Sequence, residues 1–380
     1  MTKEFQAGYY KIEVIDIIEK MYCKCFVPIR IDRWFDRIQI QSEYNTLLLQ
    51  IYRKIGHIEG MVALLNCEEI ENINGLIDRI NFMYCQPDGK QALDILKFFS
   101  QIHGDELMIQ SLKDQITLYS DINVLRSRHR KKFIILRNVI SALREEFNPV
   151  SPERIGESID DLLDVTSKYA NYFKKHNDVL NPILFSGLLL YQLLTLAPYE
   201  QNNIVYSSYA VEKYMQKLKV LPEVSLPFAK LIQNNINECE DRMAEVRWSC
   251  NINPWLTFYL NIMDKALEAI CRFIQEQHKH METSINAVNR VKNISPNMRN
   301  KMIMELGFMQ QMPFFRIEDV MKNCDITHST ATKMVDILIK LKIVKQIDNK
   351  QRYRVYEYVS LTECIKKIRE MKKFHIYGRD

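Results

Sequence analysis

The sequence predicts a mainly α-helical protein, and two observations favour this fold class. Its 380 residues include only 10 Gly and 11 Pro, under half of the average share of about 12%. That is too few for the tight turns of a β-sandwich, a propeller or a Gly-rich doubly wound nucleotide fold. Apolar residues also recur at three- and four-residue steps, the spacing of one helix face, in residues 43–65, 90–119 and 132–147. With 47% apolar and 26% charged residues, the composition is globular and excludes a disordered or collagen-like chain.

Turn and cap residues divide the predicted helices. Residues 86–89, 148–152 and 295–296 combine Pro with Gly, Asn, Asp or Ser, and they interrupt the helical spacing. Ser151 and Ser158 each precede acidic residues, a combination that predicts a helix start.

Residues 180–199 contain no charged side chain, so a membrane span has to be considered. The run includes two prolines and the polar residues Asn181, Ser186, Gln192 and Thr195. A membrane-spanning helix needs about 20 predominantly apolar residues. We therefore interpret this run as a buried central helix and expect no membrane contact.

The cysteines and the N-terminus indicate a cytoplasmic location. Nine cysteines, an odd number without paired spacing, are typical of reduced thiols rather than of a disulfide framework. Acidic residues interrupt the apolar stretch at the start of the chain, so we do not expect a signal peptide. His278 with His280, and Cys23 with Cys25, lack the spacing of a metal site, and we predict no bound metal.

Positive charge gathers near the C-terminus. Residues 301–380 contain 16 Lys and Arg against 10 Asp and Glu, whereas the other 300 residues contain 36 against 37. A basic tail on a neutral body suggests a contact with nucleic acid, although Lys is also a common surface residue. We interpret the basic run 126–132 as a solvated connection, with a supporting nucleic-acid contact as the alternative.

The basic tail contains two predicted helices. Residues 317–323 predict a short amphipathic helix, and after a turn of three or four residues a second helix follows with Thr327 or Ser329 as its cap. Apolar residues fall on one face of the second helix: Ala331, Met334, Val335, Leu338 and Leu341.

A predicted β-hairpin follows these helices. Residues 344–347 and 353–358 form two short alternating segments on either side of the polar turn 348–351. A helix–turn–helix followed by a hairpin resembles the winged-helix family, over residues 300–365.

This resemblance implies binding to double-stranded DNA. The second helix would present its N-terminal turns to the major groove, and basic residues of the hairpin would contact phosphates. The candidate DNA-binding residues are His328, Ser329, Thr330, Thr332, Lys333, Lys350, Arg352 and Arg354. The alternatives are that the module packs on the rest of the protein or forms a homodimer.

Four segments further upstream resemble, in the same order, the Fic (filamentation-induced-by-cAMP) family. Residues 190–199 (LYQLLTLAPY) are similar to the helix that leads into the family's motif, and residues 159–163 to the helix before it. Residues 242–247 and 253–260 are similar to a segment after the motif. Residues 27–65, with IGHIEG at positions 55–60, are similar to the N-terminal helix of long Fic proteins that also carry a winged helix.

The resemblance implies a helical fold and a specific chemistry. In the family, the motif HPFxDGNGRxGR transfers a nucleotidyl group, usually AMP from ATP, to a hydroxyl of a target protein. Its His is the general base, and its Gly-Asn-Gly backbone and Arg bind the phosphates. Its acid binds the metal ion that bridges them.

This sequence departs from the motif at the positions that carry chemistry. The residues at the motif positions are Ala197, Pro198, Tyr199, Glu200, Gln201, Asn202, Asn203, Ile204 and Val205. Ala197 replaces the His and Gln201 replaces the acid, with Glu200 beside it. Asn202 and Ile204 replace the two glycines of the Gly-Asn-Gly segment. Val205 and Ser208 stand where the family has arginines. Since a general base contributes about 10²–10⁴ in rate and each anion-stabilising donor about 10²–10³, we predict a degenerate site without catalytic residues and without a cofactor.

The family's autoinhibitory helix is matched only in part. Glu59 and Gly60 fit the end of its Ser-x-x-x-Glu-Gly signature, but Ile55 replaces the Ser. Because the degenerate loop has no Arg for Glu59 to pair with, we expect no autoinhibition. We interpret Gly56 and Gly60 as packing glycines on a core helix.

These patterns predict three parts: an N-terminal helical region (1–150), a Fic-like helical core (151–294) and a winged-helix domain (295–380). The resulting hypothesis is a catalytically degenerate Fic-fold regulator that binds double-stranded DNA, or scaffolds a target protein, through its winged helix. The alternative is an AMP transferase to protein hydroxyls that uses ATP and Mg²⁺ through a rearranged loop, with Glu200 on the metal and Asn202 or Asn203 on the phosphates. A purely structural homodimer is a third possibility.

Overall fold

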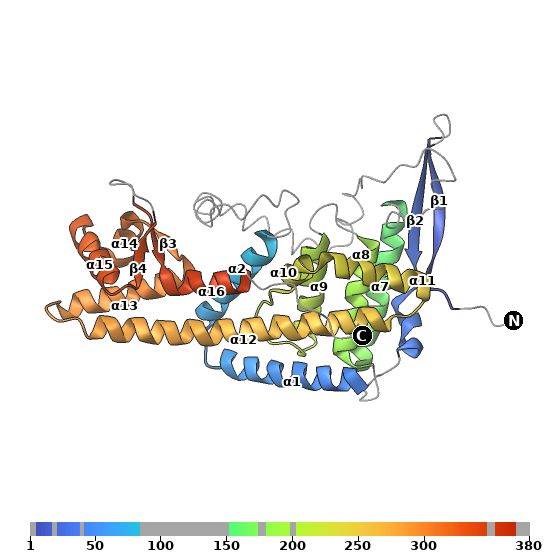
Figure 1. Ribbon diagram of the computed structural model, residues 1–380, viewed down its shortest axis with the longest axis horizontal. Helices are drawn as coiled ribbons and strands as arrows, with labels where there is room; N and C mark the ends of the chain where they lie inside the picture. Colours follow the sequence, from blue (N-terminus) through green and yellow to red (C-terminus); the bar gives the residue numbers. More distant parts are fainter. Residues whose placement is uncertain are drawn as a thin grey trace.

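The structure, a computed structural model, confirms the mainly α-helical fold class. It describes residues 5–16, 21–38, 42–83, 152–173, 180–197, 203–347 and 354–369. The predicted helices 90–119 and 132–147 and the basic run 126–132 lie outside these residues. Figure 1 shows an elongated molecule in which the helix α12 (Asn253–Asn289) runs along most of the length. A β-hairpin lies at one end, and a small three-stranded sheet with its helices lies at the other.

The N-terminal part, predicted to be helical, begins instead with an antiparallel hairpin of β1 (Gly8–Asp16) and β2 (Met21–Pro28). The register pairs the two outer ends of the strands, Gly8 with Pro28. The sequence signal for this hairpin is weak, because residues 17–20 (IIEK) contain none of the Gly, Asn or Asp residues that mark tight hairpin turns.

A two-stranded hairpin is only marginally stable by itself, so this one depends on what it packs against. Phe26 on β2 is buried, and so is Trp34 on the following 3-10 helix η1 (Ile31–Arg37). The Trp34 ring meets the ring of Tyr191 edge to face, with centroids 6.4 Å apart. Both β2 and η1 contact α8, so the hairpin and the 3-10 helix after it are held against the central helices.

Two helices, α1 (Ser42–Val62) and α2 (Cys67–Met83), follow the hairpin. The first confirms the helix predicted over residues 43–65, and it packs along α12. Lys54 on α1 donates from Nζ to Oδ1 of Asp264 on α12 over 2.7 Å. Because the Asp264 side chain is only 9% exposed, this ion pair fixes how the two helices lie against each other.

Five further helices form the central part of the molecule. They are α7 (Pro152–Phe173), α8 (Pro182–Leu196), α9 (Asn203–Lys217), α10 (Phe228–Asn234) and α11 (Ile236–Ser249). All of α8 is buried, which confirms the interpretation of residues 180–199 as a central helix. None of the described helices is both long enough and apolar enough to cross a membrane.

One predicted helix start is wrong. Ser158 lies inside α7, which runs without a break from Pro152. The apolar face of α7 continues across this position, with Ile159, Leu162 and Val165 all buried. Since burial of that face stabilises the helix more than a single cap residue disfavours it, the polar residues around Ser158 do not interrupt it.

The C-terminal part confirms the predicted order of elements. It consists of α13 (Pro296–Gln311), β3 (Phe314–Phe315), α14 (Ile317–Cys324), α15 (His328–Lys340), β4 (Val344–Gln346), β5 (Tyr356–Tyr358) and α16 (Val359–Arg369). The strands β4 and β5 pair as the predicted hairpin, and β3 adds a third strand that the sequence pattern does not reveal. The predicted strand 353–358 is shorter in the structure, where it begins at Tyr356.

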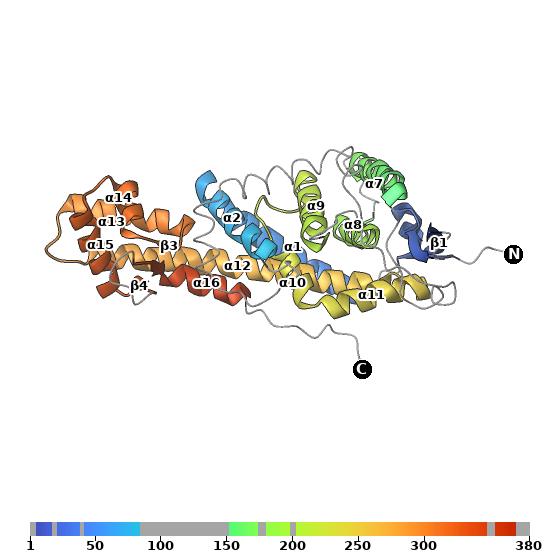
Figure 2. The ribbon, with the colours of Figure 1, turned by 90° about the horizontal axis from the view of Figure 1, so that it is seen from above.

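The helix α12 belongs to both the central and the C-terminal part. Its first half contacts α1, α8 and α10, and its second half contacts α13 and α16, which lie alongside it in Figure 2. Ser284 on α12 lies 3.3 Å, hydroxyl to hydroxyl, from Tyr358 of β5. The predicted domain boundary at residues 294/295 stays a prediction, and the C-terminal elements pack on α12 upstream of it.

A glycine sets the distance between α8 and α12. A Cβ atom at Gly187 would lie 2.7 Å from Cδ1 of Tyr259 and 2.9 Å from Cδ2 of Leu256. The backbone oxygen of Gly187 also accepts a hydrogen bond of 2.8 Å from Nε1 of Trp255. The two helices therefore approach so closely that a methyl group does not fit between them.

The interpretation of Gly56 and Gly60 as packing glycines is wrong. Both are exposed on α1, and nothing lies within 4 Å of a Cβ placed at either position. The core face of α1 is formed by apolar side chains between them and before them, Ile51, Ile55 and Ile58. No neighbour among the described residues therefore requires a glycine at either position.

Substitution of the exposed Gly56 and of the tightly packed Gly187 should have opposite effects on stability. Gly56→Ala in the middle of α1 should stabilise the protein by about 0.5–1 kcal/mol, because alanine loses less backbone entropy in a helix. Gly187→Ala should destabilise it by about 1–3 kcal/mol, because the methyl group overlaps Tyr259 and Leu256. Urea unfolding followed by circular dichroism measures both changes. A neutral Gly187→Ala variant would contradict the close α8–α12 contact.

Candidate nucleic-acid interface

A helix–turn–helix is formed by α14 and α15. Asp325, in the left-handed region at φ 47°, ends α14 and turns the chain. Thr327 then caps α15, since its side chain accepts a hydrogen bond from the backbone N–H of Thr330. A cap of this kind satisfies one of the free N–H groups at a helix start. Of the two caps considered from the sequence, Thr327 is therefore the one used.

One face of α15 is buried, and the opposite face is therefore exposed to solvent. The buried residues are Ala331, Met334, Val335 and Leu338. Among the predicted DNA-binding residues, His328, Ser329 and Lys333 are exposed, and Thr330 and Thr332 are half-buried. The structure thus brings all five predicted residues of this helix together on its first two turns.

The two threonines already make hydrogen bonds within the helix. The hydroxyl of Thr332 donates to the backbone oxygen of His328 over 2.9 Å, and the hydroxyl of Thr330 lies 3.0 Å from that of Thr327. Side chains engaged in such local bonds compete less well for an external partner. The exposed side chains of His328, Ser329 and Lys333 are accordingly the better candidates for direct contact.

The hairpin next to this helix carries the other predicted contacts. The backbone N–H of Ile347 donates to the oxygen of Val355 over 3.0 Å, so the pairing of β4 with β5 extends one step toward the connecting turn. Arg354 is exposed just before β5. Lys350 and Arg352 lie outside the described residues.

The loop that the sequence predicts to be degenerate is described only at its two ends. Ala197 follows α8 in the left-handed region at φ 43°, and α9 begins at Asn203. Pro198, Tyr199, Glu200, Gln201 and Asn202 lie outside the described residues. Ile204 packs against the core, and Val205 and Ser208 are buried. The described positions after the loop therefore turn into the protein interior.

A pocket of about 200 Å³ lies between the base of the hairpin and α7. Arg30 lines it together with the carboxylates of Glu157 and Asp161. The guanidinium of Arg30 bonds to Asp32, Asp164 and Asp161, with a shortest distance of 2.7 Å to Asp161. The hydrogen bonds that Arg30 donates to Asp32, and then to Asp164, raise the pKa of Arg30. With its cation already paired to three carboxylates, this pocket is poorly suited to bind a phosphate.

The chain was compared with protein families, curated proteins and solved structures. No protein-family model matches the sequence, and no curated protein is similar enough to count as a match. Among solved structures, the chain is similar to the crystal structure of a Fic family protein from Desulfovibrio desulfuricans G20. The two chains are 11% identical, and the likeness covers 85% of this chain and 97% of that chain with a TM-score of 0.38. A likeness at this level says nothing about the chemistry of a site.

A buried carboxyl group beneath the helix–turn–helix has no signal in the sequence. Glu305 on α13 is 1% exposed, and it accepts hydrogen bonds from the thiol of Cys324 at 3.4 Å and the amide of Asn323 at 3.5 Å. Burial raises the pKa of Glu305 to about 7, and the nearby Asp319 acts in the same direction. The sequence shows only a Glu on a helix, since its neighbours come from the next helix.

Glu305 should make the stability of the C-terminal part depend on pH. Between its ordinary pKa of 4.5 and about 7, the folded protein keeps the proton that the unfolded chain releases. The free energy of unfolding should therefore fall as the pH rises through this range. Thermal unfolding of the wild type and of Glu305→Gln, measured from pH 4.5 to 8, tests this. The variant cannot ionise at this position, so its melting temperature should decline less with pH; parallel pH profiles would contradict the assignment.

Proposed function

We propose that this protein is a Fic-like helical protein without Fic catalysis that binds double-stranded DNA through its winged helix and acts as a cytoplasmic regulator. The observation that carries the proposal is the exposed start of α15. There His328, Ser329 and Lys333 are open to solvent while the opposite face of the helix is buried.

The chemistry of this helix start suits a nucleic acid. The N-terminus of a helix carries free N–H groups and the positive end of the helix dipole, both of which favour phosphate. Lys333 adds a full positive charge one turn further along, and His328 and Ser329 offer hydrogen-bonding groups to phosphates or base edges. An α-helix also has the diameter that the major groove accepts.

The surroundings of the degenerate loop support the absence of Fic catalysis. Ala197 has no side chain able to accept a proton, and Val205 and Ser208, at the family's arginine positions, are buried. Arg30, in the pocket beside α7, is already bonded to three aspartates. Neither place offers the free cations that neutralise a transferring phosphoryl group.

Removing single positive charges from the proposed interface should weaken DNA binding in a salt-dependent way. Lys333→Ala and Arg354→Ala should each lower the slope of log K against log salt by about 1, the effect of one lost phosphate contact. Fluorescence anisotropy of the full chain with a pool of random-sequence duplexes, titrated at several salt concentrations, measures this.

Lys217→Ala is the matched control, because Lys217 is an exposed lysine at the end of α9 in the central part of the molecule. It should leave the slope unchanged. Equal binding by all three variants and the wild type would contradict the proposed interface. Light scattering and calorimetric titration with ATP and Mg²⁺ then separate the remaining readings: a stable dimer favours the structural role, and nucleotide binding favours the transferase.

A further inference from the structure

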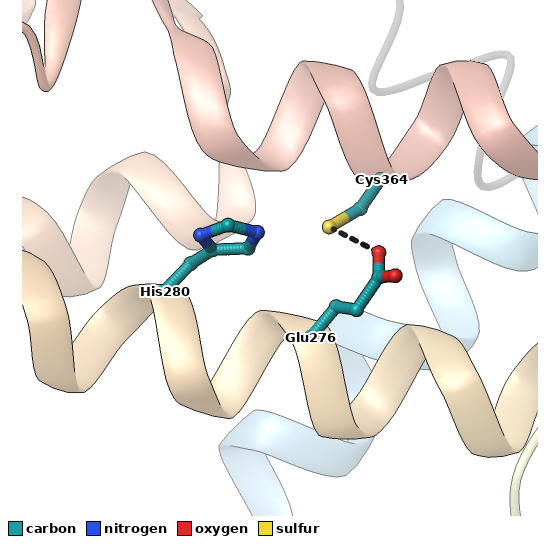
Figure 3. Close-up of side chains that lie close together, drawn as sticks. All are labelled: Glu276, His280 and Cys364. Atoms are coloured by element: carbon teal, nitrogen blue, oxygen red, sulfur yellow. Dashed lines mark hydrogen bonds between the residues drawn. The ribbon is translucent and has the colours of Figure 1, made fainter.

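Three potential metal ligands meet where α16 packs on α12. Glu276 and His280 lie four residues apart on α12 and therefore on the same face, one turn from each other. Cys364 on α16 lies opposite them, and Figure 3 shows the three side chains converging on the space between the two helices. This contact joins residues that are distant in the sequence.

The distances fit a small ion after a modest adjustment. One ligand atom from each residue lies within 4.8 Å of the others, and the Cys364 thiol donates to Oε2 of Glu276 over 3.6 Å. Tetrahedral Zn²⁺ holds such atoms roughly 3.3–3.8 Å apart, given bond lengths of about 2.0–2.3 Å. Side-chain rotations that move each ligand atom by about 1 Å would close the difference. Glu276 and His280 have room for such rotations because they are only half-buried.

We propose that Glu276, His280 and Cys364 bind a Zn²⁺ ion that joins α16 to α12, with water as the fourth ligand. Thiolate, imidazole and carboxylate together form a ligand set that zinc prefers and that magnesium and calcium do not. Cys364 is 2% exposed and closes the inner side of the site, whereas the half-buried ligands leave an outer side for the water. On binding, the thiol gives up its proton to solvent and the thiolate bonds to the metal.

A lysine holds the carboxylate in the structure. Nζ of Lys367 on α16 lies 2.9 Å from both carboxylate oxygens of Glu276. The Lys367 side chain is 63% exposed, so it can swing into solvent when an ion takes its place. The ammonium thus supplies the positive charge beside Glu276 that the metal ion would supply in the loaded site.

Because of where it lies, a bound ion would affect how the winged helix is held. The helix α16 begins at Val359, directly after the central strand β5. A metal bond from Cys364 to α12 would therefore fix the last helix of the winged helix to the long helix of the body. This inference is independent of DNA binding, and its test uses no DNA.

The full-length protein, freed of metal with a chelator, is titrated with Zn²⁺ against a chromophoric chelator and separately with Co²⁺. We expect one Zn²⁺ per chain, and with Co²⁺ a near-ultraviolet absorption from a thiolate ligand. Cys364→Ser should abolish that absorption. Cys364→Ser and His280→Ala should each weaken Zn²⁺ affinity by more than about 100-fold, since groups that only orient a ligand already contribute roughly 10–100-fold.

Two controls match the ligands in type. His278→Ala removes an exposed histidine from the same helix, where its ring lies 3.5 Å from Glu282, and Cys67→Ser removes an exposed thiol. Both variants should bind Zn²⁺ like the wild type. Circular dichroism verifies folding, and His280→Ala keeps the test valid should Cys364→Ser fail to fold.

Lys367→Ala distinguishes a metal site from a hydrogen-bonded cluster. It should tighten Zn²⁺ affinity roughly 2- to 5-fold, the range that corresponds to the free energy of an exposed ion pair. An unchanged or weaker affinity would show that Glu276 is not a ligand and overturn the three-residue site. Absence of Zn²⁺ binding, absence of the thiolate absorption, or undiminished affinity in Cys364→Ser and His280→Ala would overturn the proposal as well.

Discussion

The long helix α12 is the element on which the rest of the structure depends, because helices of the N-terminal, central and C-terminal parts all pack on it. Its two halves are buried in different ways. From Trp255 to Ile274 its apolar side chains meet α1, α8 and α10 on several sides. This packing requires the close approach that Gly187 permits. Beyond Ile274, only Ser284 and Val288 of α12 are buried, so the second half is a platform covered on part of its surface by α13 and α16.

The contacts along the two halves differ in chemistry as well. The first half is held by aromatic and aliphatic burial, the dominant favourable contribution to folding. Along the second half, polar contacts are prominent, such as Gln277 with Gln310 at 2.7 Å and Lys367 with Glu276. Exposed polar and ionic contacts contribute little free energy each. A zinc ion at Cys364 would strengthen this half where apolar burial is sparse.

The interior of the central part depends most on α8, the helix that is buried along its whole length. The packing of α8 between its neighbours uses every residue from Pro182 to Leu196, and none of this depends on a catalytic loop. Val205 and Ser208, just after the start of α9, are buried as well. The central core therefore extends from α8 into the start of α9.

The sequence by itself determined the mainly helical class, the buried helix at 180–199 and the order of elements from α14 to β5. It narrowed the cap of α15 to Thr327 or Ser329. Each of these follows from local signals: apolar spacing, turn residues and cap residues within a few positions. The wrong start at Ser158 and the missed hairpin β1–β2 came from the same local signals, where burial outweighed a cap and where a turn lacked its usual residues.

Only the tertiary structure decided which side chains meet. Gly56 and Gly187 are both helical glycines in the sequence, but one faces solvent and the other faces Tyr259. Glu276 and His280 have helical spacing, but the ligand that completes the cluster, Cys364, comes from a helix more than 80 residues later. Contacts of this kind depend on how elements pack, and a pattern that repeats every three or four residues carries no information about a partner so far along the chain.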